Sequence, residues 1–146
     1  MKRGTLAIRL FLAVIFFYSG LVKASGSAQF AIALAPFAMV PDTWIHPLSV
    51  LLPLVEIAGA ALIVVPWTKR IGAFLVLALC LLFITALGWA LANGIIVDCS
   101  CFGQEQRPSA AKMILALLRD IFLAVLALVV LVKGGSRAFR SGRYQA

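Results

Sequence analysis

Four long apolar runs follow one another along the chain, and basic, aromatic or turn residues separate them. The runs cover about residues 6–22, 47–65, 71–91 and 113–132. An α-helix rises about 1.5 Å per residue, so roughly 20 apolar residues cross a hydrocarbon core of about 30 Å. The pattern therefore predicts four membrane-spanning helices.

A shorter apolar run covers residues 30–40, where it is interrupted by Pro36 and followed by Pro41. It is too short to cross the bilayer as a helix. We expect an interfacial or re-entrant helix between the first and second spans. The predicted fold class is an all-α integral membrane protein, a four-helix transmembrane bundle over residues 1–132 with a basic tail at residues 133–146.

Composition and charge agree with a membrane protein. The hydrophobic fraction is 64% and the mean hydropathy is +1.10, far above the values of soluble domains. The net charge of +8 could indicate a nucleic-acid partner, but the basic residues follow a topological pattern instead. We expect the tail to lie against anionic lipid headgroups and no nucleic acid to bind.

Lys and Arg in short loops stay on the cytoplasmic side of a membrane. With the N-terminus inside, nine of the 13 basic residues are cytoplasmic: Lys2, Arg3, Arg9, Lys69, Arg70, Lys133, Arg137, Arg140 and Arg143. Lys23, Arg107 and Lys112 are then outside. Both termini are predicted in the cytoplasm of a bacterium whose inner membrane holds the protein. A first span cleaved as a signal peptide is the less favoured alternative.

Two cysteines, Cys99 and Cys101, flank Ser100 in the loop before the fourth span. The predicted topology places them outside, where disulfides form and persist. A disulfide across so small a ring is held away from relaxed torsions, which favours exchange. Three interpretations stay open: a redox-active dithiol, which we prefer, a static loop-closing disulfide, and a metal site. The metal site is weakest because structural zinc needs four ligands.

Two other residues are candidates of lower weight. Cys80 lies near the middle of the third span, where a small apolar packing role is expected. His46 precedes Pro47 near the outer interface. It could carry protons, although a solvated loop histidine is the commoner case.

Ionisable residues within the spans are expensive in a bilayer and usually face a bundle interior. Glu56, Arg119 and Asp120 are such residues. Arg119 and Asp120 point about 100° apart on an ideal helix, so we expect them to be poor partners for each other. Glu56 and Arg119 lie at matching depths and are predicted to pair.

This pairing leaves Asp120 without an assigned cation. It could be protonated, hydrogen-bonded to Thr85 or Ser19, or paired with Lys23. A functional proton site and a structural charge cluster both remain possible for these groups.

The sequence resembles the DoxX-like superfamily, and most closely its methylamine utilisation MauE branch. The matching features are Phe16-Phe17-Tyr18-Ser19-Gly20 with Lys23, Leu54-Val55-Glu56 with Gly59, Asp98-Cys99-Ser100-Cys101-Phe102-Gly103, and Arg119-Asp120. The resemblance implies an inner-membrane protein connected with redox chemistry. MauE-like proteins are associated with maturation of a disulfide-rich periplasmic dehydrogenase subunit, alongside a thioredoxin-like partner, and DoxD-like relatives with thiosulfate and quinone.

The working hypothesis is a membrane thiol-disulfide oxidoreductase. Cys99 and Cys101 would exchange electrons with an extracytoplasmic thioredoxin-fold protein and a membrane quinone, with no metal. The alternative is a non-enzymatic scaffold for assembly of a partner, in which the cysteine pair is a static disulfide. A small-solute transporter is disfavoured because the four spans include no discontinuous pair.

Overall fold

The protein folds into five α-helices in a computed structural model that describes residues 2–36, 40–96 and 109–135. The helices are α1 (Lys2–Ser25), α2 (Ser27–Leu34), α3 (Asp42–Val64), α4 (Lys69–Ala92) and α5 (Ala110–Gly135). Four of them, all except α2, are long and apolar enough to cross a membrane. The described residues contain no strand, and the predicted all-α fold class is confirmed.

The helices α1, α3, α4 and α5 all begin before the apolar runs on which they were predicted. α3, for example, starts at Asp42 rather than at Pro47, which lies inside the helix together with Pro53. A helix continues past the hydrocarbon core because its backbone groups still gain internal hydrogen bonds there, and polar residues are tolerated at that level. The apolar runs therefore mark the centres of the helices better than their ends.

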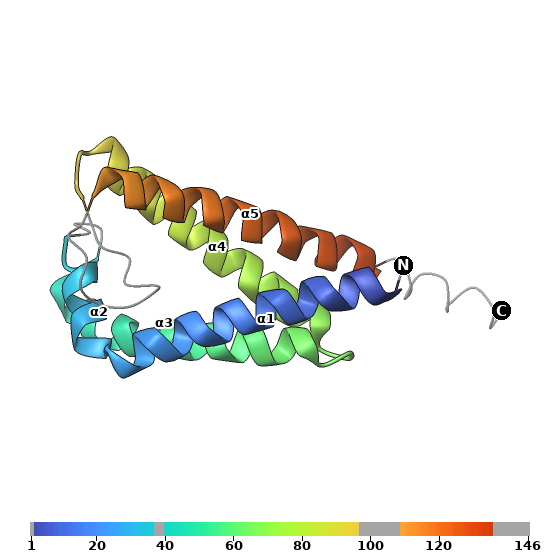
Figure 1. Ribbon diagram of the computed structural model, residues 1–146. Helices are drawn as coiled ribbons and strands as arrows, with labels where there is room; N and C mark the ends of the chain where they lie inside the picture. The colour runs from blue at the N-terminus through green and yellow to red at the C-terminus, as the bar shows by residue number, and fades with distance from the viewer. Residues whose placement is uncertain (1, 37–39, 97–108, 136–146) are drawn as a thin grey trace.

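The four long helices pack as a ring. α1 contacts α3, α3 contacts α4 and α4 contacts α5, while the contact between α5 and α1 is less extensive. The start of α1, the turn between α3 and α4, and the end of α5 lie at one end of the bundle (Figure 1). We call this the terminal end, and the end that carries α2 the α2 end.

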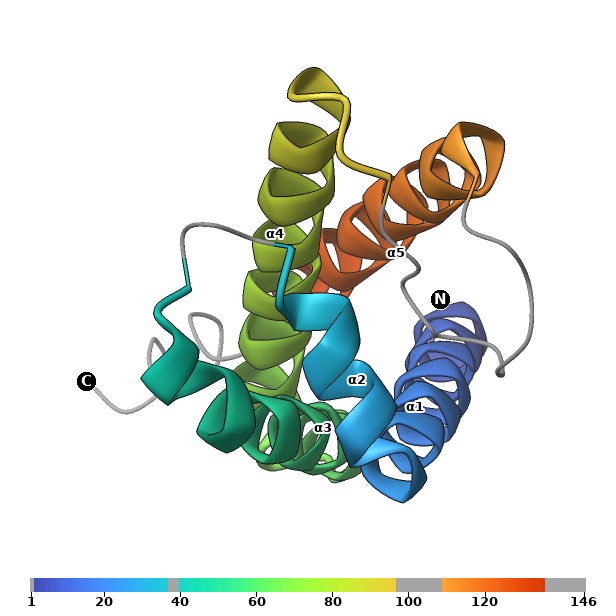
Figure 2. The same cartoon turned by 90° about the vertical axis from the view of Figure 1, so that its left-hand side faces the viewer.

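The helix α2 lies across the α2 end of the bundle, over α3 and α1 (Figure 2). The short helix between the first two spans is confirmed, but it begins at Ser27 and ends at Leu34, earlier than the run of residues 30–40. Pro36 explains the early end, because a proline has no N–H group to continue the hydrogen bonds of the helix.

The apolar core lies mainly toward the terminal end. Its buried residues include Leu12 of α1, Ile63 of α3, Val76 of α4 and Ala127 of α5. Figure 1 shows α1 and α5 close together there and further apart toward the α2 end. The bundle is therefore packed with apolar side chains at one end, and polar groups are left to fill the wider part.

Two glycines allow the helices to approach closely. A Cβ atom on Gly20 of α1 would lie 2.8 Å from Cγ1 of Ile57 and 3.0 Å from the carbonyl oxygen of Pro53, both on α3. A Cβ on Gly72 of α4 would collide with the backbone of Leu62 and Ile63. Small residues at helix contacts are typical of membrane bundles, where close backbone packing drives association.

Arg9 connects α1 to the end of α3. Its Nε donates to the carbonyl of Ile63 at 2.8 Å and its Nη2 to the carbonyl of Val64 at 2.6 Å. These carbonyls belong to the last turn of α3, where the backbone carbonyls receive no hydrogen bond from within the helix. The same turn carries the negative end of the helix dipole. The arginine thus joins α1 to α3 at the terminal end of the bundle.

The outer surface of the bundle is apolar. Val14, Phe74 and Leu115 expose 67%, 60% and 69% of their areas. Apolar exposure on this scale marks a surface that contacts something other than water. Together with the four long apolar helices, it shows that the partner of this surface is the lipid bilayer.

Candidate functional site

A buried ion pair joins α1 to α3. Nζ of Lys23 donates to Oε1 of Glu56 at 2.5 Å, and each side chain is 1% exposed. Lys23 lies in the last turn of α1, close to the α2 end, and Glu56 lies in the middle of α3. Burying two charges is favourable only when they are closely paired, so this contact fixes the register of α1 against α3.

Two aromatic rings surround the ammonium of Lys23. Its Nζ lies 4.2 Å from the ring centroid of Phe83 on α4 and 5.5 Å from that of Phe30 on α2. Both distances are within the range of cation–π attraction. The lysine therefore contacts α2, α3 and α4 at once. The sequence reasoning missed both rings, because no residue spacing relates Phe30 and Phe83 to Lys23.

A second ion pair lies within α5. Arg119 donates to Oδ1 of Asp120 from Nη2 at 2.8 Å and from Nε at 3.0 Å. The side chains are 26% and 8% exposed. The expectation that these neighbours are poor partners is wrong. Their Cα–Cβ bonds do diverge, but the long arginine side chain folds back and presents two N–H groups to one oxygen.

The predicted Glu56–Arg119 pair is also wrong, because Lys23 takes Glu56 and Arg119 takes Asp120. Asp120 therefore has a cation, contrary to the expectation. Thr85 does not serve it either: its hydroxyl donates to the carbonyls of Leu81 and Leu82 in its own helix, at 2.9 Å each. The four charged residues lie around one cavity. Lys23 pairs with Glu56 and Arg119 pairs with Asp120, which differs from the expected pairing.

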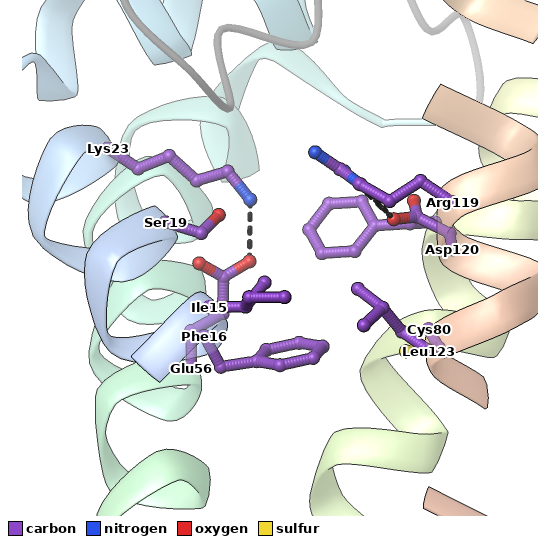
Figure 3. Close-up of a pocket in the computed structure, with 10 residues that line it drawn as sticks. Ile15, Phe16, Ser19, Lys23, Glu56, Cys80, Arg119, Asp120 and Leu123 are labelled. Carbon is purple, nitrogen blue, oxygen red and sulfur yellow. Dashed lines mark hydrogen bonds and ion pairs between the residues drawn. The ribbon is translucent and has the colours of Figure 1, made fainter. Parts of the chain in front are cut away.

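The two ion pairs face each other across a small cavity. Figure 3 shows Lys23, Ser19 and Glu56 on one side and Arg119 and Asp120 on the other. The lining residues come from α1, α3, α4 and α5: Ile15, Phe16, Ser19, Lys23, Glu56, Cys80, Phe83, Arg119, Asp120 and Leu123. The charges sum to zero, so the cluster as a whole is tolerable in a low-dielectric surrounding.

The cavity is narrow. Its volume of about 20 Å³ is close to the space that one water molecule requires. A quinone ring does not fit in it. The space is sufficient for one water molecule.

Cys80 and His46 differ in their position relative to this cavity. Cys80 is 1% exposed, packs in the apolar core and lines the cavity. Its predicted packing role is confirmed, but its contact with the charged cluster was not foreseen. His46 is exposed in the second turn of α3, not in a loop, and is not among the residues that line the cavity.

Cys99 and Cys101 lie outside the described residues. The helices that flank them are placed: α4 ends at Ala92 and α5 begins at Ala110, both at the α2 end (Figure 1). The connection that carries the cysteines therefore joins two helices at the end opposite to the basic start of α1. Within residues 2–36, 40–96 and 109–135, no group of three His, Cys, Asp or Glu side chains could hold a metal ion.

Comparison with known proteins gives a single consistent result. The family model described as methylamine utilisation protein MauE matches residues 1–133. The methylamine utilization protein MauE of Paracoccus denitrificans is 30% identical over 125 residues, which is 85% of this chain and 66% of that relative. The chain thus spans a little less than two thirds of the relative's length. No solved structure matches.

Proposed function

The chain belongs to the methylamine utilisation protein MauE family, and from this premise we propose that it is a membrane thiol-disulfide oxidoreductase. Cys99 and Cys101 form the reactive pair, and the partner is a thioredoxin-fold protein outside the cytoplasm. The activity assists maturation of disulfide-containing extracytoplasmic proteins for methylamine utilisation. The protein resides in the inner membrane of a bacterium with both termini in the cytoplasm.

The observation that supports the proposal is the position of the two helices that flank the cysteine pair in the sequence. The end of α4 and the start of α5 both lie at the α2 end of the bundle (Figure 1). The basic residues at the start of α1 and at the start of α4 lie at the other end, which the charge bias assigns to the cytoplasm. Persistent disulfide chemistry needs the oxidising side of the membrane.

The exchange transfers two electrons between the two proteins and needs no other reactant. One thiolate of the reduced partner attacks the Cys99–Cys101 disulfide, forms a mixed disulfide and releases one thiolate of this chain. The second thiolate of the partner then attacks the mixed disulfide, so the partner is oxidised and both cysteines of this chain are reduced. The reverse sequence reduces a partner disulfide. In either direction two electrons cross between the proteins.

A membrane quinone is the proposed exchange partner on the lipid side, and it would accept two electrons and two protons from the dithiol. The described cavity does not fit it, because its volume of about 20 Å³ leaves no room for a ring. We therefore derive no step through a quinone at the charged cluster. The pair of Lys23 and Glu56 instead joins α1 to α3.

A scaffold without enzymatic activity is the second candidate, and the pairing of the buried charges favours it. Each carboxylate of the cluster has its own cation in the resting structure, as expected of groups that specify packing. In this case the disulfide is static and the protein assists the assembly of a partner without exchanging electrons.

Trapping of a mixed disulfide distinguishes the two functions. Cys99→Ser and Cys101→Ser should each abolish exchange, because one sulfur must be attacked and the other must resolve the intermediate. Only one of the variants should accumulate a covalent complex, visible as a shift on non-reducing gels and identified by mass spectrometry. Cys80→Ser is the control and should exchange normally, because Cys80 is buried. Full exchange in both single variants would exclude the oxidoreductase.

A further inference from the structure

One oxygen of the buried cluster lacks a partner. Oε1 of Glu56 accepts from Lys23, but Oε2 is buried and has no hydrogen-bond partner among the described residues. A buried carboxylate oxygen without a donor loses its hydration and gains nothing in return. Such atoms are rare in native structures, and an unseen water or a bound proton is the usual explanation.

The cavity beside Glu56 meets the requirements of a water site. Its volume of about 20 Å³ holds one water, which also needs two to four polar partners. Ser19, Arg119 and Asp120 line the same cavity, and their hydroxyl, guanidinium and carboxylate groups can donate to or accept from a water. An apolar cavity of this size would stay dry, whereas the polar side chains that line this cavity can hold a water molecule.

We propose that this cavity holds an ordered water molecule that donates a hydrogen bond to Oε2 of Glu56, and that Glu56 binds and releases a proton through this water. A hydronium ion that takes the place of this water gives its proton to Oε2 and remains as the ordered water, and the reverse step releases the proton. The ligand is a proton with its hydrating water. Neither Asp120 nor His46 is its principal acceptor.

The surroundings of Lys23 allow Glu56 to become neutral. When the carboxylate is protonated, the ammonium loses its counter-ion but keeps the rings of Phe83 and Phe30, at 4.2 and 5.5 Å. Cation–π attraction is stronger in a desolvated site than at an exposed one. These rings reduce the destabilisation that a buried cation suffers when its carboxylate is discharged.

The other charged and titratable groups that face Glu56 come from three elements. They are Lys23 on α1, Cys80 on α4, and Arg119 and Asp120 on α5. Oδ1 of Asp120 already accepts two N–H groups of Arg119, whereas Oε2 of Glu56 has no donor among the described residues. Arg119 is 26% exposed and marks the open side of the cavity, by which water enters.

This proton site is independent of the exchange chemistry of Cys99 and Cys101. It rests on the geometry of the described cluster alone, and its tests use chains in which both cysteines are replaced by serine. Failure of the thiol exchange therefore leaves the proton site standing, and failure of the proton site leaves the exchange standing.

Infrared difference spectroscopy tests the protonation. The full chain in lipid nanodiscs is titrated with acid, and we expect the carbonyl stretch of a neutral buried carboxylic acid to appear and to shift in D₂O. Glu56→Gln should remove this band, and the exposed carboxylate control Asp42→Asn should keep it. If Glu56→Gln does not fold, Lys23→Met with Glu56→Gln removes both charges and serves instead. A band that persists without Glu56, or no band, would overturn the proposal.

Silver-ion labelling tests the water. Cys80 lines the cavity, so a hydrated cavity brings Ag⁺ to its sulfur. The control is Ala127→Cys with Cys80→Ser, which places the thiol in the apolar core, where Ala127 is 0% exposed. We expect Cys80 to react about tenfold faster than the control, since access governs thiol modification. Equal rates would show a dry cavity and contradict the proposal.

Discussion

Lys23→Met is expected to lower the free energy of unfolding by about 3 to 5 kcal/mol, the usual effect of removing one partner of a buried ion pair. The substitution keeps much of the side-chain volume but removes the only described hydrogen-bond donor to Oε1 of Glu56. The Oε1 atom of a carboxylate that is 1% exposed would then lose its cation. Unfolding in mixed detergent micelles, followed by circular dichroism, measures the loss.

The reciprocal change should have a smaller effect. In Glu56→Gln the amide oxygen still accepts from Lys23, and the rings of Phe83 and Phe30 still hold the ammonium. The double variant Lys23→Met, Glu56→Gln should be more stable than Lys23→Met alone, because no charge remains unpaired. A double variant no more stable than Lys23→Met would contradict the pair.

Arg119→Gln provides the matched control within the same cluster. Its partner Asp120 lies on the same helix, and the guanidinium is 26% exposed, so its pair is weaker than a fully buried one. The loss of stability should be smaller than in Lys23→Met. In a double-mutant cycle, the coupling between Arg119→Gln and Glu56→Gln should be smaller than the coupling between Lys23→Met and Glu56→Gln, because Lys23 and not Arg119 contacts Glu56 directly.

Gly72→Ala is expected to destabilise the bundle by about 2 to 3 kcal/mol, near the upper end of the usual effect of overpacking. The new Cβ would lie 2.6 Å from the carbonyl carbon of Leu62 and 2.7 Å from Cα of Ile63. These are backbone atoms, so no change of rotamer relieves the collision. α3 and α4 must move apart next to the turn that joins them. The same detergent unfolding assay measures the loss.

Gly88→Ala is the control on the same helix. No atom lies within 4 Å of a Cβ at this position, and alanine is the better helix former by about 1 kcal/mol. This variant should be as stable as the native chain or slightly more stable. Equal losses in both variants would contradict the account, because helix propensity favours alanine at both positions and only Gly72 meets the backbone of α3.

The sequence was sufficient to predict the helices and insufficient to predict how the buried charges pair. Apolar runs long enough to span a bilayer leave few alternatives to helices, so the four long helices and the short helix before Pro36 followed directly. The helix ends could not be predicted in the same way. Hydropathy indicates which residues lie in the hydrocarbon core, and it does not indicate where the backbone hydrogen bonds of a helix end. Asp42, for instance, begins a helix whose apolar run was placed at residues 47–65.

The pairing failed for two physical reasons. Lys23 was considered as a partner of Asp120 and not of Glu56. It lies in the last turn of α1, and the close approach of α1 and α3 at Gly20 brings it to Glu56. Arg119 was excluded from Asp120 by the direction of the Cα–Cβ bonds, which does not limit a side chain of its length. The position of a residue along its helix indicates which charged side chains lie at the same depth in the membrane. It does not determine which of these side chains are in contact.

The redox state of Cys99 and Cys101 in intact cells tests the proposed function most directly. A membrane-impermeant thiol reagent is applied, in a Cys80→Ser background, before and after inhibition of the respiratory chain. The oxidoreductase predicts that both cysteines are labelled from outside, and that the labelled fraction changes reversibly with respiratory activity. A pair that stays fully oxidised under every condition, or that is reached only from the cytoplasm, would contradict the account.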